Sequence, residues 1–154
     1  RLNSDEEYNA RSLTLSLKEN SVPVMKRAKA ISEILMNLPN SFQGTLKAHM
    51  IRCDVSIEKL AELAMLSDST VKRLRQSERH GYDLDQVLAI CLALHLPPDL
   101  SFDLIAKAGI LLRNTAEHLV YRTILRTMYM ESLETIQATL KECGCQTLHL
   151  KDVG

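Results

Sequence analysis

A cluster of basic side chains lies in a short stretch of this chain, between residues 72 and 80. Four lysines and arginines fall there, with Glu78 as the one acid among them. Guanidinium and ammonium groups donate hydrogen bonds to phosphate oxygens, and the arginine fork also matches O6 and N7 of guanine. The same residues could instead form a solvated charged face. The element that carries them therefore decides between the two interpretations.

The pattern around this cluster is that of two short helices joined by a tight turn, over Ser56–Ser77. Ser56 is suited to cap the first helix, and Glu58 follows in the first turn, where the helix dipole favours an acid. Ser67 is suited to cap the second helix. The residues expected on the buried side are Leu60, Ala61, Leu63, Ala64, Val71 and Leu74. This is the layout of a helix-turn-helix, which leaves one face of its second helix open.

The open face and the basic cluster supply two sets of candidate binding residues. Side chains in the N-terminal part of the second helix are placed to contact base edges in a DNA major groove. These are Asp68, Ser69, Thr70 and Arg73. Side chains around them, together with the start of the first helix, are placed to contact phosphates. These are Ser56, Lys59, Lys72, Arg75, Arg79 and His80.

Most of the remaining chain has helical periodicity, so the expected fold class is all-α. An apolar stripe indicates an amphipathic helix that ends before Pro39, and consists of Val24, Ala28, Ile31, Leu35 and Leu38. Five more helices are expected: Ser41 to Cys53, Asp83 to Leu94, Ser101 to Ala108, Asn114 or Thr115 to Tyr129, and Ser132 to Gly144. In the last of these, Leu133, Ile136, Leu140 and Cys143 are expected to face inward. Alternation at Leu13, Leu15 and Leu17 indicates one short strand, while the spacing of Leu13 and Leu17 also matches an i, i+4 pair on a helix.

No set of residues in the sequence suggests catalysis, and we expect no enzyme activity, cofactor or metal. Cys143, Cys145 and His149 supply only three candidate ligands, whereas a structural zinc site has four. Neither an H-E-x-x-H motif nor a glycine-rich phosphate loop occurs. Cys53 and Cys91 fall within apolar helical patterns, which is typical of buried, reduced thiols and predicts a cytoplasmic location. No apolar run is long enough to span a membrane.

The stretch Ser56–Leu94 resembles the Cro/repressor-type (XRE) helix-turn-helix regulators. The residues that carry the resemblance are Ile57-Glu58-Lys59-Leu60-Ala61, Leu66-Ser67, Ser69-Thr70-Val71, Leu74, Leu84 and Ala93-Leu94. It implies a repressor-like bundle of five helices, from about Ser41 to Ala108, that binds operator DNA, commonly as a dimer. The chain departs from the family pattern at Ile57, at Met65 in the turn, and at Arg75 and Ser77 near the end of the second helix.

Together these features predict a DNA-binding domain over residues 41–109, preceded by a segment with one helix (1–40) and followed by a helical extension (110–154). The expected function is transcriptional regulation through double-stranded DNA, with a possible homodimer through the C-terminal helices. The zero formal net charge argues against a strong nonspecific polyanion binder. The alternative is a helix-turn-helix-like regulatory or protein-interaction domain of a larger protein. The start at Arg1 and the strand-like leucines motivate that alternative.

Overall fold

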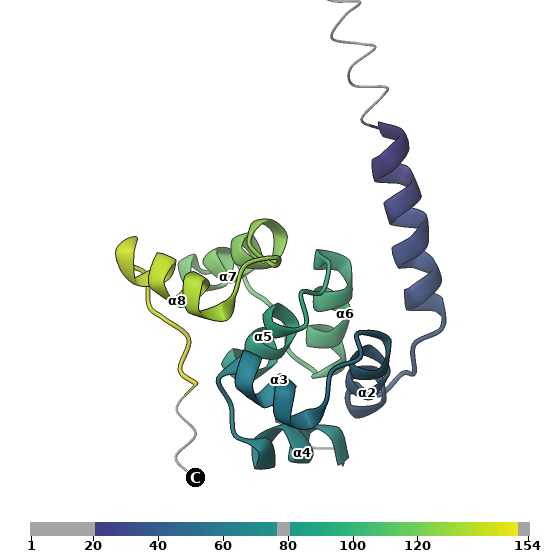
Figure 1. The fold of residues 1–154 in the computed structure, drawn as a ribbon. Coiled ribbons are helices and arrows are strands. Elements are labelled where there is room, and N and C mark those ends of the chain that lie inside the picture. Colours follow the sequence, from purple (N-terminus) through teal and green to yellow (C-terminus); the bar gives the residue numbers. More distant parts are fainter. Residues whose placement is uncertain (1–20, 77–80, 151–154) are drawn as a thin grey trace, which may run out of the picture. The chain divides into compact units, whose positions relative to one another are not determined.

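The computed structural model describes residues 21–76 and 81–150, and every regular element in these ranges is a helix (Figure 1). The chain divides into two units, Arg1–Asn37 and Leu38–Gly154. The described part of the first unit is one helix over residues 21–36. It ends before Pro39 as predicted, and the Asn37 side chain donates to the carbonyl of Glu33 (2.8 Å) at its end. The strand expected at Leu13–Leu17 lies outside the described residues.

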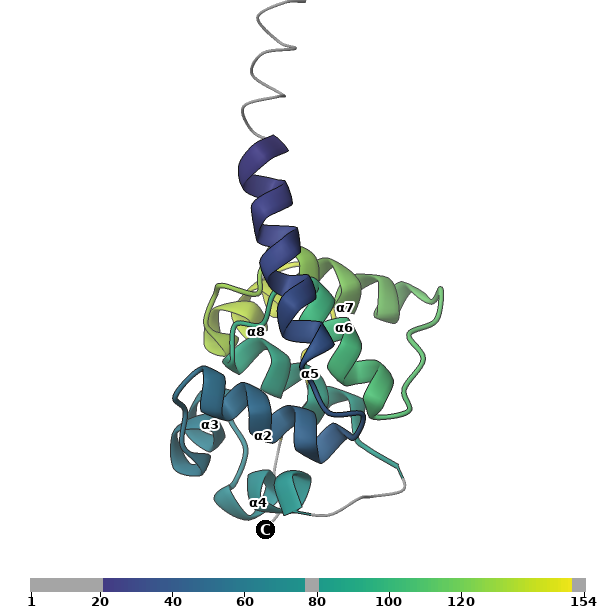
Figure 2. The ribbon, with the colours of Figure 1, turned by 90° about the vertical axis from the view of Figure 1, so that its right-hand side faces the viewer.

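The second unit is a bundle of seven described helices around α5. The helices are α2 (Phe42–Arg52), α3 (Ile57–Ala64), α4 (Asp68–Gln76), α5 (Leu84–Ala93), α6 (Pro98–Lys107), α7 (Ala116–Thr127) and α8 (Leu133–Glu142). Every residue from Val87 to Leu94 is buried, because α3, α6, α7 and α8 all pack against α5. In both views α4 lies at one edge of this unit and α7 and α8 lie toward the opposite edge (Figures 1 and 2). The predicted all-α fold is confirmed for the described residues.

Polar side chains begin six of these helices at the predicted positions. In each case the side-chain oxygen accepts the amide hydrogen of the residue three positions later at 3.1 Å, which satisfies a donor that has no partner inside the helix. The capping residues are Ser41, Ser56, Ser67, Asp83, Thr115 and Ser132. Each cap is worth about 1 kcal/mol, so these local signals determine where the helices begin.

Several expected boundaries and orientations were wrong. Helix α6 begins at Pro98 and not at Ser101, because proline fits the first helical turn, where its missing amide hydrogen has no partner to lose. Helix α7 ends at Thr127, two residues before Tyr129. Cys143 is exposed and not inward, because α8 has already ended at Glu142 and Gly144 turns the chain with a φ of 71°.

Residues 145–150, which follow α8, pack against the bundle, although the sequence there has no clear helix or strand pattern. Leu148 and Leu150 are buried. The Gln137 side chain on α8 donates to the Leu148 carbonyl (2.9 Å) and accepts from the Leu148 amide (2.8 Å). The amide of His149 donates to a carboxylate oxygen of Asp85 on α5 (2.8 Å). These bonds hold the segment against the bundle.

The cysteines carry thiols, and one of them is deeply buried as predicted. Cys91 on α5 is fully covered, and burial raises the pKa of its thiol to about 12. Cys53 is half-buried. Within the described ranges, no three His, Cys, Asp or Glu side chains are grouped so that they could hold a metal ion, and no helix is long and apolar enough to cross a membrane.

Candidate nucleic-acid interface

A tight turn joins α3 to α4 and is closed by backbone hydrogen bonds. Met65 adopts the left-handed conformation (φ 56°, ψ 38°) at the end of α3. Its amide donates to the carbonyl of Glu62 (3.3 Å), and the amide of Leu66 donates to that of Ala61 (2.9 Å). Glycine would adopt this φ without strain, whereas a residue with a Cβ pays about 1 kcal/mol. The turn therefore keeps its geometry although Met65, and not a glycine, occupies this position.

Helix α4 is anchored on one side and exposed on the other. Val71 and Leu74 are at most 1 % exposed and pack toward α2 and α3, where Ala61 and Ala64 are also buried. Small side chains on α3 let the two backbones approach closely. The exposed residues of α4 are Asp68, Ser69, Lys72, Arg73 and Gln76. The exposure expected on this helix is confirmed for Asp68, Ser69, Lys72 and Arg73.

Thr70 is a correction to the predicted outer face, because its side chain is completely buried. Its Oγ1 accepts hydrogen bonds from Nη2 of Arg73 (3.1 Å) and from Oγ of Ser67 (3.0 Å). The hydroxyl of Ser67 also lies 3.0 Å from that of Ser69. Thr70 lies four residues before the buried Leu74, so the two side chains share the inner side of the helix.

Comparison with family models matches residues 45–99 to the Cro/C1-type helix-turn-helix DNA-binding domain. Residues 45–99 form a Cro/C1-type helix-turn-helix domain. The match runs from within α2 to the start of α6 and includes the whole of α3, α4 and α5. A search of curated proteins and a search of solved structures gave no match. The chain therefore contains a domain of the DNA-binding type, and α3 and α4 are the two helices that its tight turn joins.

The candidate phosphate contacts of the Cro/C1-type domain differ in how available they are. Ser56 is exposed, and its hydroxyl caps α3. Lys59 lies 3.6 Å from Glu62, and both side chains are more than half exposed, so this ion pair is weak. Lys72 is exposed and Arg75 is half-buried on α4. Arg79 and His80 lie outside the described residues.

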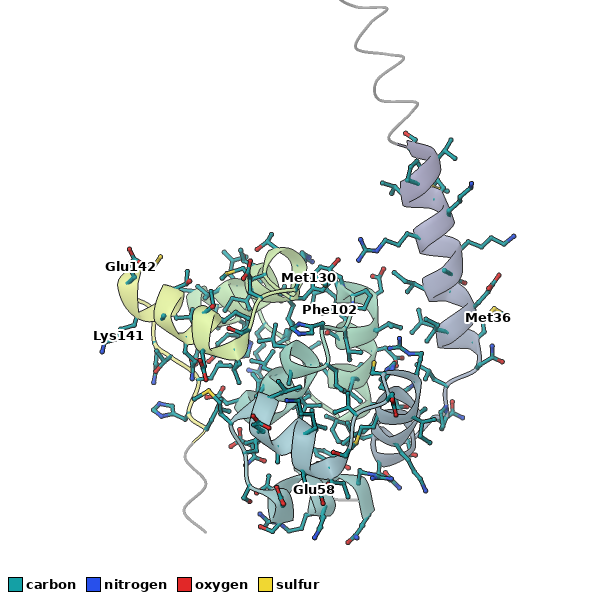
Figure 3. All side chains as sticks on the ribbon, in the orientation of Figure 1. Met36, Glu58, Phe102, Met130, Lys141 and Glu142 are labelled. Atoms are coloured by element: carbon teal, nitrogen blue, oxygen red, sulfur yellow. The ribbon has the colours of Figure 1, made fainter. Side chains whose placement is uncertain are left out.

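Helix α4 itself carries a net positive charge, and an acid lies in the first turn of both α3 and α4. Helix α4 carries Lys72, Arg73 and Arg75 against Asp68, a net charge of +2 from three cations and one anion. Asp68 lies in the first turn, where it complements the helix dipole. Glu58 does the same on α3, and Figure 3 shows it on the side of the domain that carries α4. Both carboxylates stabilise the starts of their helices and lower the net positive charge of this side of the domain.

Proposed function

We propose that this chain is a transcriptional regulator that binds operator DNA by inserting α4 into the major groove. The observation that carries the proposal is the two-sided character of α4. Val71 and Leu74 hold it from beneath, while Ser69 and Arg73 remain exposed within a Cro/C1-type domain. A helix held in this way can present its polar side chains to a duplex while Val71 and Leu74 stay buried.

In this proposal the N-terminal part of α4 contacts bases. Arg73 donates two hydrogen bonds to O6 and N7 of a guanine, and Ser69 and Asp68 contact neighbouring base edges, with Asp68 accepting from a cytosine amino group. Thr70 is withdrawn as a base contact because it is buried.

Phosphate contacts on either side would fix the position of α4 along the groove. On α4 these are Lys72 and Arg75, and on α3 they are Lys59 and the amides that follow Ser56. Arg79 and His80 stay candidates for the same role. Such contacts carry no sequence information, so they would contribute equally to binding on all duplexes.

Binding as a homodimer through the C-terminal helices is part of the proposal. Tyr121, Ile124 and Leu125 of α7 are buried within the unit itself, so they contribute to its core. Leu119 on the same helix is 58 % exposed and is available to a second copy. The cytoplasmic location also stays a prediction.

Selection of bound sites from random duplex DNA at fixed salt tests this function, with sedimentation of the protein–DNA complex in parallel. We expect an enriched, two-fold symmetric site with a guanine in each half and two chains per duplex. Arg73→Ala should lose the preference at that guanine, whereas Arg113→Ala, an exposed arginine before α7, should keep it. Absence of any enriched site would contradict the proposal and favour a protein-interaction role for the domain.

A further inference from the structure

We infer that Thr70 is a positioning residue that holds the guanidinium of Arg73 in place for base recognition. The inference rests on the proposed function. Thr70 is inaccessible to solvent, so it cannot contact DNA itself. Its Oγ1 nevertheless accepts a hydrogen bond from Nη2 of Arg73, an exposed residue, at 3.1 Å. A buried hydroxyl therefore restrains a side chain that points to the outside of the helix.

The position of this bond along α4 determines where the guanidinium lies. Helical side chains tilt toward the N-terminus, and residues three apart are neighbours on the helix surface. Arg73, by bonding to Thr70, is drawn back toward the end of α4 that carries Asp68 and Ser69. That is the end which enters a major groove in helix-turn-helix proteins. The bond thus places the guanidinium at the contacting end of the helix.

One hydrogen bond to Thr70 leaves most of the arginine's donor capacity for a ligand. A guanidinium has five N–H donors in one rigid plane, so directing one of them also orients the others. Arginine is a flexible side chain and loses rotamer freedom when it binds. Restraint before binding reduces that loss and favours one orientation of the fork. The ligand that gains from this is a planar two-acceptor edge, which in the major groove is guanine.

The Thr70 hydroxyl is itself fixed by the cap of α4. Ser67 accepts the amide hydrogen of Thr70 (3.1 Å) and donates its own hydroxyl hydrogen to Thr70 Oγ1 (3.0 Å). The backbone beneath is anchored by Val71 and Leu74, which are buried. Because the acceptor is buried and bonded to Ser67, its bond to Arg73 ties the arginine to the body of the domain. Thr70 therefore connects the cap residue Ser67 to the arginine proposed to contact the base.

Substitutions of Thr70 test the inference in the full chain on duplexes that carry the selected site. Thr70→Val has nearly the same shape and lacks the acceptor, Thr70→Ala lacks both the acceptor and a methyl group, and Thr70→Ser keeps the acceptor. The quantity measured is the ratio of Kd values for the selected site and for a site with the contacted guanine replaced. We expect this ratio to fall about threefold to tenfold in Thr70→Val and Thr70→Ala, and to recover in Thr70→Ser.

A second buried threonine provides a matched control for loss of stability. Thr45 on α2 is also fully buried, and its hydroxyl donates to the carbonyl of Pro39 (3.0 Å), which is not part of α4. Thr45→Val should therefore leave the ratio unchanged. Thermal unfolding of each variant shows that the domain is folded at the temperature of the binding assay. A fall of the ratio in Thr45→Val as large as in Thr70→Val would overturn the inference, since loss of stability alone would then explain it.

The combination of Thr70→Val with Arg73→Ala shows whether Thr70 acts through the arginine. We expect Thr70→Val to have no further effect on the ratio once Arg73 is absent, because the group that it positions is gone. An unchanged ratio in Thr70→Val alone, or an equal fall with and without Arg73, contradicts the positioning role. If the parent protein shows no preferred site, the proposed function fails and this inference fails with it. If Arg73→Ala relaxes the preference and Thr70→Val does not, the positioning role alone is wrong.

Discussion

Protonation of a buried histidine should make the stability of the fold depend on pH. His49 on α2 is fully buried. Its Nδ1 lies 3.1 Å from Nη2 of Arg52, which can only donate, so the neutral ring carries its proton on Nε2. Nε2 has no hydrogen-bond partner within the described residues. Burial, followed by the charge of Arg52, lowers the pKa of His49 from 6.5 to about 4. On α6, Asp103 raises it and Lys107 lowers it further.

The direction and size of the effect follow from this difference in pKa. Between pH 6.5 and pH 4 the unfolded chain binds a proton at His49 that the folded chain does not. The contribution of His49 to the free energy of unfolding is therefore fully present above pH 6.5 and is lost as the pH is lowered toward 4. The gap between the two pKa values corresponds to a loss of about 3 kcal/mol once the pH is below both, and about 2 kcal/mol at about pH 5. This is a large fraction of the stability of a domain of this size.

Urea unfolding at about pH 8 and about pH 5, followed by circular dichroism, measures this loss. His49→Leu has a similar volume and no titrating group, so its stability should fall by about 2 kcal/mol less than that of the parent between the two conditions. His149→Gln removes an exposed histidine and serves as the control, with the parent's dependence expected. The same loss in the parent and in His49→Leu would refute the assignment to His49.

Four further substitutions test the interface and the cap of α4. Arg73→Ala should weaken binding to the selected site by about 1–3 kcal/mol and relax the preference at one base pair, as measured by fluorescence anisotropy. Lys72→Ala should weaken binding to all duplexes alike and reduce the slope of log K against log salt by about one; an unchanged slope would argue against a phosphate contact. Glu58→Gln should strengthen binding about twofold to fivefold at low salt, while Glu142→Gln, exposed at the end of α8 (Figure 3), should have no effect. Ser67→Ala should lower the free energy of unfolding by about 1 kcal/mol, and unchanged stability would mean that the cap contributes nothing.

The helix-turn-helix could be predicted from the sequence because its signals are local. Ser56 and Ser67 accept amides within their own first turns, so the chemistry of three or four neighbouring residues is enough to place both helix starts. Val71 and Leu74 are apolar residues three apart, which defines the inner side of α4 without any knowledge of what covers it. The exposure of Arg73 follows from the same periodicity.

Features that depend on the partner of a side chain could not be predicted in this way. Thr70 is a polar residue, but it is fully buried and its hydroxyl bonds to Ser67 and Arg73, so polarity alone gave the wrong side. Leu148 is buried in a segment that bonds through Leu148 to Gln137 on α8 and through His149 to Asp85 on α5, and Asp85 is distant in sequence. Met65 adopts a backbone conformation that favours glycine, and only the surrounding turn explains why it does so.

Contact between Arg73 on α4 and a guanine in the major groove can be probed by methylation interference on the selected site. N7 of guanine lies in the major groove and accepts one of the two proposed hydrogen bonds, so its methylation should block binding at one guanine in each half-site. Arg73→Ala should bind methylated and unmethylated duplexes equally at that position. Interference that is unchanged in Arg73→Ala, or that occurs only at minor-groove positions, would contradict the account.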